Sequence, residues 1–350
     1  MIKSAKLALI LILVVLFSGC TDTETSDVAT NTNGVSFEVY ADTLQPQLYE
    51  GQSFSFQVMA ENNGGYTVPV SHLNLFLGGI SPTTYSSAAE DFAKSNTLDL
   101  TSIGIYNEET TVRGQEVFSF EELCYQTDLS SDLDVDFHLK ACYDYKTNAK
   151  AGACFGEAYS QFNEICTVTE QKTVTNTVAP VQVTEIYESS AGQDSYRFIV
   201  KVENLGNGEV FSQYASADSS SNDLTEVITE SVSSCRDLNP ADLNVVYIDS
   251  IKLDGVEQLD LDTFQLETYR ENEDVASIED GKGRFFNLVN DRGQFIFKIS
   301  DVTESSDFVG NLEIVLGYGY SETKIRSAEL VSLPDVVPDC QAWNSFKYFQ

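Results

Sequence analysis

Three aspartates at alternate positions, Asp132, Asp134 and Asp136, are the strongest candidates for a metal site in this sequence. Residues two apart along an extended strand point to the same face, so the three carboxylates would lie side by side. Carboxylate oxygens are ligands that Ca²⁺ prefers, and a bound cation would relieve their mutual repulsion. We treat them as a candidate calcium site and expect no other cofactor. The alternative is a solvated acidic surface, because the spacing lacks the glycine and the distal glutamate of an EF-hand loop.

Side chains suited to catalysis are few. Nucleophilic catalysis needs a nucleophile with a base in reach, and the chain has two histidines, His72 and His138. Each stands in a strand-like run that alternates with apolar residues, which predicts that both point to solvent. The sequence contains no G-x-S-x-G, H-E-x-x-H or P-loop motif. We therefore expect a protein that is not an enzyme.

Seven cysteines are the remaining reactive side chains. One of them, Cys20, directly follows an apolar N-terminal segment. The other six are an even number, which favours disulfides in an exported protein; they are Cys124, Cys142, Cys154, Cys166, Cys235 and Cys340. Zinc is the weaker interpretation, because the sequence has no C-x₂-C pair and no nearby histidine cluster.

The pairing of these cysteines follows from one expected turn. Thr147-Asn148 is typical of a hairpin turn, and a hairpin centred there would place Cys142 opposite Cys154 at a distance that suits a disulfide. The remaining pairs would then be Cys124–Cys166 and Cys235–Cys340, of which the second would join the C-terminal tail to an insertion in the second half. The alternative pairings among the first four cysteines stay open.

The first twenty residues indicate export. Two lysines precede an unbroken apolar run from Leu7 to Phe17, and Ser18-Gly19-Cys20 follows. A positive start, a short apolar run and small residues before a cut site are typical of a secretory signal, whereas a membrane span needs about 20 apolar residues. Leu16 to Cys20 resembles a prokaryotic lipobox, in which the cysteine becomes the lipid-bearing first residue. We therefore expect a signal peptide over 1–19 and lipidation of Cys20.

Residues 20–34 consist of the lipidated Cys20 and a polar segment of 14 residues that separates it from the rest of the chain. Its composition predicts a flexible tether, and 14 residues reach about 45–50 Å when extended. Two acyl chains would give stable anchoring. The expected location is therefore outside the cytoplasm, on the cell surface, with the membrane as a partner through the lipid.

The charge balance excludes other partners. Lys and Arg number 20 against 54 Asp and Glu, a net charge of −34. A strongly acidic chain is unsuited to nucleic acid, because phosphates need a basic face, and it is equally unsuited to electrostatic docking on anionic lipid. Hydrophobic residues make up 42% of the chain, which is enough for packed cores.

The two halves of the chain resemble each other. Residues 53–64 match residues 195–206, with Phe56 against Phe198 and Glu61-Asn62 against Glu203-Asn204. Two further matches follow in the same order: Arg113-Gly114-Gln115 against Arg292-Gly293-Gln294, and residues 137–145 against residues 312–320. Three matches in order predict an internal duplication.

The matched segments alternate apolar and polar residues and are bounded by Gly- and Asn-rich turns, which predicts strands. We therefore predict a mostly β fold with two tandem immunoglobulin-like β-sandwiches. The first would cover residues 35–178. The second would cover residues 179–350, with an insertion near 211–242 and a C-terminal tail. Short helices are expected at Ser87–Glu90, which fits a capping box, and near Leu224, Val227 and Ile228.

A family resemblance rests on two of these segments. The strand ending in Val-Glu-Asn-Leu-Gly-Asn-Gly-Glu-Val at 202–210 resembles the second strand of CARDB-like, cell-adhesion-related immunoglobulin-type domains. A late Tyr-x-Tyr strand in that family is similar to Tyr143-Asp144-Tyr145 and Tyr318-Gly319-Tyr320. The resemblance implies a surface domain of immunoglobulin type and is poorly specific for function.

Aromatic residues offer a second candidate binding surface. The tyrosines of both Tyr-x-Tyr motifs share one strand face, which in a sandwich is more often core than ligand surface. Trp343, Phe346, Tyr348 and Phe349 follow the last strand, either packed back or exposed as a contact patch.

These features together predict a cell-surface lipoprotein that acts as a binding or structural module in adhesion, cell–cell contact or envelope assembly. The alternative is a binding subunit of an envelope complex that recognises polysaccharide or another polymer, with calcium dependence as one form. The expected partners are a surface protein or a polysaccharide, and not nucleic acid.

Overall fold

The computed structural model of the chain describes residues 32, 34–40, 43–85, 92–106, 110–156, 165–192, 194–215, 223–259, 261–278, 283–302, 307–333, 338 and 340. The leader 1–19, Cys20 and nearly all of the tether lie outside these residues. The expected helix at Ser87–Glu90 and the aromatic segment from Trp343 to Phe349 also lie outside them. Across the described ranges, no helix combines the length and apolar character needed to cross a membrane.

Strands dominate the described chain, which confirms the mostly β prediction. The strands are β1 (Val35–Val39), β2 (Gln47–Tyr49), β3 (Ser53–Asn62), β4 (Leu73–Gly78), β5 (Ala93–Ser95), β6 (Gly104–Tyr106), β7 (Thr110–Val112), β8 (Gln115–Cys124), β9 (Leu133–Phe155), β10 (Glu170–Lys172), β11 (Val174–Asn176), β12 (Val181–Gly192), β13 (Ser195–Asn204), β14 (Glu209–Phe211), β15 (Val245–Leu253), β16 (Val256–Glu257), β17 (Phe264–Leu266), β18 (Arg270–Glu271), β19 (Arg284–Asn287), β20 (Arg292–Ile299) and β21 (Phe308–Val331). The helical elements are α2 (Leu224–Ser233), the 3₁₀ turn η2 (Pro240–Asp242) and α3 (Glu273–Ile278).

The first lobe is a sandwich of two sheets. One sheet has the order β1-β3-β8, and along β3 buried residues such as Phe56 and Val58 alternate with exposed ones, as in a sheet with one face on a core. The facing sheet contains β2, β4, β5, the first half of β9 and the last half of β21. The rings of Phe56 and Phe137 meet between the two sheets, with centroids 5.8 Å apart.

The second lobe repeats this plan. Its first sheet has the order β10-β12-β13-β20-β17, and the facing sheet contains β15, β18 and β19 with the remaining halves of β9 and β21. The ring of Phe155 on β9 packs between the sheets, 4.8 Å from Tyr196 and 6.4 Å from Phe198 by centroids. Two β-sandwiches are therefore present, as predicted.

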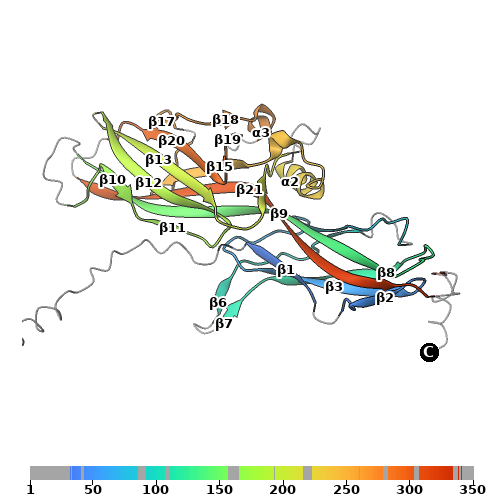
Figure 1. Cartoon of the computed structure of the whole chain (residues 1–350). Coiled ribbons are helices and arrows are strands. Elements are labelled where there is room, and N and C mark those ends of the chain that lie inside the picture. Colours follow the sequence, from blue (N-terminus) through green and yellow to red (C-terminus); the bar gives the residue numbers. More distant parts are fainter. Residues whose placement is uncertain are drawn as a thin grey trace, which may run out of the picture.

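The two lobes share one continuous pair of strands. β9 and β21 pair antiparallel from Phe308↔Phe155 to Leu330↔Leu133 without a register shift. Figure 1 shows both strands running through the upper and the lower lobe. The segments 35–178 and 179–350 therefore each build the larger part of one lobe and send half of their longest strand into the other.

The register of this ladder agrees with the predicted duplication. Residue 144 matches residue 319 in the repeat, and Asp144 pairs directly with Gly319. On either side, Tyr143 pairs with Tyr320 and Tyr145 pairs with Tyr318, so repeat-related residues exchange partners. This exchange is what an approximate two-fold axis through the Asp144–Gly319 pair requires. We call this pair the crossing point.

The predicted helix at Leu224, Val227 and Ile228 is confirmed as α2. Asp223 begins it as the N-cap, because its carboxylate accepts from the Thr225 N–H at 2.8 Å. The helix buries Val227 and Val232 in a cluster that also contains Phe76, Phe211 and Cys142. The insertion therefore covers the back of the shared sheet near the crossing point.

The six predicted cysteines form three disulfides, but the predicted pairing is wrong. The disulfides are Cys124–Cys340, Cys142–Cys235 and Cys154–Cys166, with Cα separations of 5.8, 6.4 and 5.8 Å that suit such bonds. Cys142–Cys154 fails because Thr147-Asn148 is no turn: it lies within β9, which continues straight through it. Twelve residues of strand separate the two cysteines by about 40 Å.

The observed pairing connects distant parts of the fold. Cys142–Cys235 fixes α2 to the shared sheet, and Cys124–Cys340 fixes the end of the chain to β8 across a sequence separation of 216. A loop of that length gives a stabilisation of up to about 5 kcal/mol in the chain-entropy description of disulfides. Three disulfides indicate an oxidising, extracytoplasmic environment.

Peptide mapping of the unreduced protein checks this connectivity. We expect proteolytic fragments that link Cys142 to Cys235 and Cys124 to Cys340, because β9 holds Cys142 and Cys154 too far apart to bond. Fragments linking Cys142 to Cys154 would contradict a continuous β9. The same digest after reduction and alkylation is the control for cross-linked peptides.

Candidate functional site

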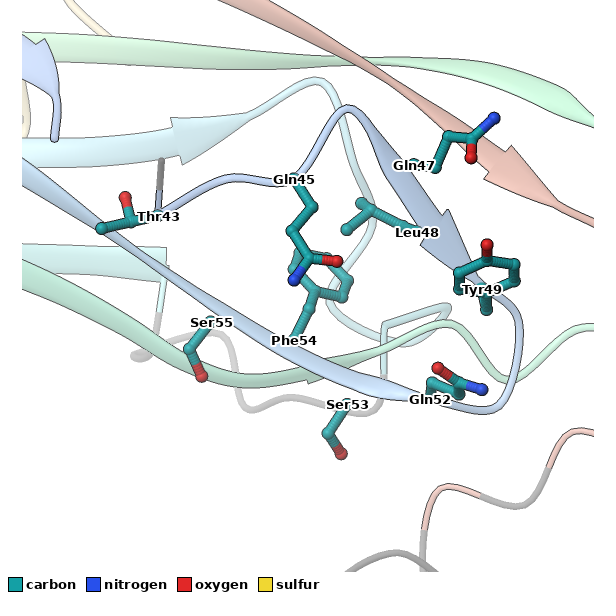
Figure 2. A pocket seen from close by; sticks show the side chains of 9 residues that line it. All are labelled: Thr43, Gln45, Gln47, Leu48, Tyr49, Gln52, Ser53, Phe54 and Ser55. Carbon is teal, nitrogen blue, oxygen red and sulfur yellow. The ribbon is translucent and has the colours of Figure 1, made fainter. Parts of the chain in front are cut away.

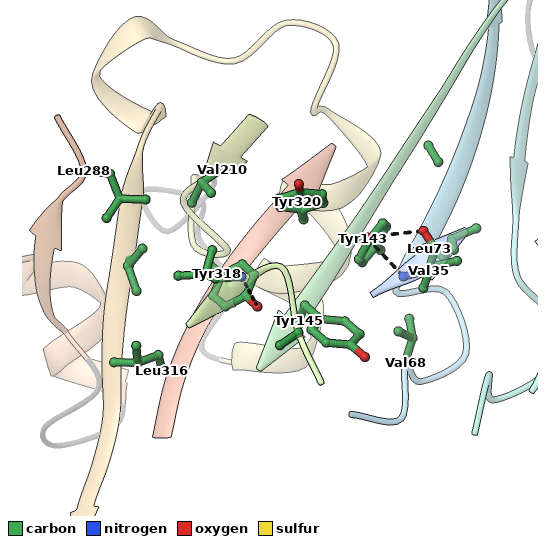
Figure 3. Packing of buried hydrophobic residues seen from close by; sticks show 14 of the residues in the cluster. Val35, Val68, Leu73, Tyr143, Tyr145, Val210, Leu288, Leu316, Tyr318 and Tyr320 are labelled. Carbon is green, nitrogen blue, oxygen red and sulfur yellow. Dashed lines mark hydrogen bonds between the residues drawn. The ribbon is translucent and has the colours of Figure 1, made fainter. Parts of the chain in front are cut away.

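Four tyrosines meet at the crossing point. Tyr143, Tyr145, Tyr318 and Tyr320 are buried, and the cross-strand partners lie with ring centroids 5.7 and 6.4 Å apart. Figure 3 shows them projecting from the β9–β21 ladder among residues of both cores. The prediction that this face is core rather than a ligand surface is confirmed.

The first tyrosine of each motif holds the start of a strand. The Val35 N–H donates to the Tyr143 hydroxyl at 3.2 Å, and the Val181 N–H donates to the Tyr318 hydroxyl at 3.4 Å. Burial raises the pKa of both phenols well above the ordinary value of 10. Both hydroxyls therefore stay protonated and remain hydrogen-bonding groups in the two cores.

The second tyrosine of each motif holds a loop. The Tyr66 N–H donates to the Tyr145 hydroxyl at 3.3 Å, and the Gly208 N–H donates to the Tyr320 hydroxyl at 2.6 Å. Burial raises the pKa of Tyr320 to about 12, although the bond from Gly208 opposes this shift. Repeat-related tyrosines therefore make the same bond in each lobe.

The asparagine of each Glu-Asn pair completes these loops. The Asn62 side-chain amide donates to the carbonyl of Tyr66 at 2.6 Å, and the Asn204 amide donates to the carbonyl of Gly208 at 2.9 Å. The Tyr145 hydroxyl donates to the side-chain oxygen of Asn62 at 3.2 Å. The motif that carries the family resemblance thus has a structural role in both halves.

His72 differs from its prediction. It is 5% exposed, and its Nδ1 lies 2.7 Å from the Asp144 carboxylate. The prediction that it points to solvent is wrong because β4 is buried on both faces, so Asn74 and Phe76, which alternate with the core leucines as His72 does, are buried as well. His138, on β9, is exposed as predicted.

A second pair lies beside the first and joins the half-buried Lys146 to the buried Asp249. The Lys146 Nζ is 2.7 Å from the Asp249 carboxylate, and the Gln213 amide donates to the same carboxylate at 3.3 Å. Asp144 and Lys146 lie on the same face of β9, one residue either side of Tyr145. The buried carboxylates of Asp144 and Asp249 therefore each have a partner, and the two pairs join β9 to both halves of the chain.

A third buried carboxylate lies in the second lobe. Glu188 on β12 is fully buried, accepts from the Cys154 N–H at 2.8 Å, and lies 3.1 Å from the Lys172 Nζ. Lys172 also donates to the carbonyl of Thr167. Desolvation raises the pKa of Glu188 to about 7, although the Cys154 bond and Lys172 oppose this shift.

The three aspartates of the candidate calcium site are exposed at the start of β9. Asp132 accepts from the Ser332 N–H at 2.9 Å, and Asp136 accepts from the Ser327 hydroxyl at 2.6 Å. Across the described ranges, which include Asp134, no three His, Cys, Asp or Glu side chains are grouped so that they could hold a metal ion. The expectation that these residues form one site is therefore not supported by their arrangement.

An open pocket lies at the end of the first lobe, and we call it the tip pocket. It encloses about 320 Å³, within the roughly 300–1,000 Å³ of small-molecule sites. Its lining comes from the 43–47 crossover, β2 and the start of β3: Thr43, Gln45, Gln47, Leu48, Tyr49, Gln52, Ser53, Phe54 and Ser55. None of these nine side chains carries a charge at neutral pH.

The chain forms this pocket by changing sheets. β1 pairs with β3 only as far as Val39↔Val58, and β2 then pairs in parallel with β21 in the opposite sheet. Among the described strands, the start of β3, from Ser53 to Ser55, therefore has β8 on one side and no strand on the other. Figure 2 shows Gln45 and Phe54 directed toward one another, with Ser53 and Ser55 pointing away. Those two serines thus face the pocket with their backbone.

A second pocket, of about 410 Å³, lies in the second lobe beside α2 and η2. Its lining includes three carboxylates, Asp237, Asp242 and Asp274, together with Asn239 and Asn272. An acidic lining is ordinary in a chain with a net charge of −34. The uncharged lining of the tip pocket is the more unusual of the two.

Comparison with known proteins gives no family. No family model matches the chain, and no curated protein matches it. Among solved structures, the MSCRAMM ACE of Enterococcus faecalis, described as binding its ligands by the collagen Hug model, aligns over 87% of this chain and 96% of its own. The identity is 10% and the TM-score is 0.13, so this likeness carries no argument about the fold or the function.

The tip pocket was missed by sequence reasoning, although a signal exists. Residues 43–55 contain three glutamines and a single charged residue, Glu50, in a chain with 54 acidic residues. Glu50 is itself buried, where it accepts from the N–H groups of Leu129 and Leu333. This local lack of charge is a weak signal, because residues 62–89 contain no Asp, Glu, Lys or Arg either.

Removal of one crossing-point hydroxyl tests its structural role. We expect Tyr145→Phe to lower the free energy of unfolding by about 1–3 kcal/mol, because the Tyr66 N–H and the Asn62 side-chain oxygen each lose a partner. Denaturant unfolding measures the change. Tyr40→Phe, at a tyrosine that is 48% exposed, is the matched control. An equal stability for Tyr145→Phe and the wild type would contradict the assigned role.

The raised pKa of Glu188 predicts a pH dependence. The folded state holds this proton up to about pH 7, whereas the ordinary value is 4.5. Between these values the folded state binds more protons, so its stability falls as the pH rises, by about 3 kcal/mol from this group, and levels off above pH 7. Unfolding from pH 4 to pH 8 measures this profile. Glu188→Gln should remove this part of the slope and Glu185→Gln should not; an unchanged slope in Glu188→Gln would refute the assignment.

Proposed function

We propose that this protein is a lipid-anchored module of the cell envelope that binds a partner outside the membrane. The N-terminal signal and Cys20 supply the anchor, and residues 20–34 supply the tether. The three disulfides support an extracytoplasmic site of action. The proposal assigns the protein no catalytic step.

The shape of the molecule supports a display role. β1 begins at the crossing point, where Val35 bonds to Tyr143, so the tether joins the folded part near its centre. The two lobes extend from there in opposite directions (Figure 1). The end of the first lobe, with β2 and the start of β3, is therefore distant from the point of attachment and available to a partner.

The single observation that carries the binding role is the open tip pocket. None of the nine residues that line it is charged, whereas three aspartates line the pocket of the second lobe. Cys124–Cys340 and the Ser53↔Cys124 register pair brace the β3 side of the pocket. A braced site loses less conformational entropy when it binds.

Two classes of partner fit this role. A surface protein would make the molecule an adhesion or assembly module. A polysaccharide would make it a binding subunit that recognises a polymer, and the neutral, amide-rich lining of the tip pocket favours this second candidate.

Site-specific photo-crosslinking in intact cells tests the proposal. A photoreactive residue at Gln52, on the tip pocket, should give a covalent adduct with an envelope component, because the partner covers this residue. The same photoreactive residue at Gln265, which is exposed on β17 in the other lobe, is the matched control.

The intact mass of the uncrosslinked protein tests the anchor. It should correspond to a chain that begins at Cys20 and carries added lipid. Reduction should add two hydrogens for each of the three disulfides.

Protease and glycosidase treatment of the adduct would show its class. Equal crosslinking from Gln52 and Gln265, or none from either, would contradict a binding role for the tip pocket. A mass that retains residues 1–19 would contradict the lipid anchor.

A further inference from the structure

We propose that the tip pocket binds an uncharged, hydroxyl-rich ligand, namely a saccharide unit of an envelope polysaccharide. This inference rests on the proposed binding role of the pocket and specifies the class of ligand. It follows from three features of the pocket: the lining is uncharged, some of its hydrogen-bonding groups are free, and its open strand edge is short.

The absence of charge in the lining argues against an ionic ligand. Thr43, three glutamines and the backbone of Ser53 and Ser55 supply polar groups, and none of these groups is charged. The surrounding chain has a net charge of −34, which repels anionic ligands. A cationic ligand would find its counter-charges in the acidic pocket of the second lobe rather than here. An uncharged polar ligand is the class that remains.

Part of the polar lining is already used by the protein. Thr43 accepts from the Gln57 N–H at 3.1 Å, and the Gln47 amide donates to Glu329 at 2.8 Å. The Ser55 hydroxyl accepts from the Glu122 N–H at 3.1 Å. These groups hold the pocket in shape and are not free to bind a ligand through the same atoms.

Other polar groups are free. In the described part of the chain, the side-chain amides of Gln45 and Gln52 bond to no other residue. The N–H and C=O groups of Ser53 and Ser55 point away from β8, because the odd-numbered residues of β3 bond toward the β1 side, as Gln57 does with Tyr40. β1 has ended there, so this short edge has no strand beside it.

These free groups match a saccharide. An amide side chain presents both a donor and an acceptor, and so does each peptide unit of the open edge. A sugar hydroxyl also donates and accepts, so several hydroxyls on one ring can pair with neighbouring amides and carbonyls. The half-buried ring of Tyr49 lies in the same lining and offers an apolar face to the C–H side of a sugar.

An extended peptide fits the pocket less well. Strand addition gains its affinity from a row of backbone bonds, and among the described residues the stretch of β3 without a strand on this side is only a few residues long. The side chains of Ser53 and Ser55 point away from the pocket (Figure 2), which leaves no alternating apolar pockets for peptide side chains. The edge is long enough for a sugar ring and short for a strand.

Titration of the full-length, detergent-extracted protein tests the inference. The probes are neutral trisaccharides of glucose, mannose, galactose or N-acetylglucosamine, with trigalacturonic acid as the charged comparison. We expect at least one neutral trisaccharide to bind saturably by calorimetry and to slow hydrogen–deuterium exchange in the peptide that contains Ser53 and Ser55. Gln45→Glu and Gln52→Glu should weaken this binding about tenfold, because a carboxylate cannot donate and each loses a hydrogen bond.

Gln265→Glu is the matched control, because it adds the same charge at an exposed site in the other lobe and should leave the affinity unchanged. Exchange outside the tip pocket shows that each variant is folded. The inference is overturned if no neutral saccharide protects the Ser53–Ser55 peptide, if protection falls in the second lobe, or if both glutamate variants bind as the wild type does. A protein adduct from Gln52 in cells, without saccharide binding, would keep the binding role and reject the saccharide.

Discussion

The uninterrupted pairing of β9 with β21 is the constraint on which the rest of the structure depends. One antiparallel ladder runs through both lobes, so neither sandwich is complete without a half-strand from the other half of the chain. At its centre four tyrosine hydroxyls receive backbone N–H groups from the strands and loops of both halves, for example from Val35 and Gly208. A buried N–H without a partner is costly, so these hydroxyls fix where β1, β12 and the two Asn-containing loops lie. The orientation of the lobes and the position of the tether follow from this arrangement.

The two halves of the duplication differ at its own axis. Asp144 and Gly319 are equivalent in the repeat and pair with each other, yet they make different contacts. Asp144 is a buried carboxylate and is matched by His72, whereas a Cβ atom on Gly319 would lie 2.2 Å from the ring of Phe211. The glycine therefore makes room for the insertion, which packs on one half of the back of the sheet and is fixed there by Cys142–Cys235. A symmetric framework thus supports two different surfaces.

The elements that depend on local pattern could be predicted from the sequence, and those that depend on distant pairing could not. Alternation gave the strands around Phe56 and Phe198, and helical spacing gave α2. The connection of Cys142 to Cys235 could not be predicted, because Thr147-Asn148 has the composition of a turn but is held straight by twenty-three consecutive cross-strand pairs. His72 was misplaced for a related reason: its run alternates, but β4 is buried on both faces, the second of them by the distant insertion. The tip pocket depends on β1 and β2 pairing in opposite sheets, and no local pattern encodes that change.

The distribution of charge connects the fold to the proposed role. The buried Lys172 pairs with Glu188 and the half-buried Lys146 pairs with Asp249, so these two basic side chains are used internally. An acidic surface keeps the molecule soluble and disfavours contact with anionic polymers. At the tip pocket the chain instead presents amides and an open strand edge, and Glu50, the one acidic residue of segment 43–55, is buried and accepts from the N–H groups of Leu129 and Leu333. The bonds that close the end of the sandwich therefore also keep this carboxylate out of the pocket lining, and stability and recognition are met by one arrangement.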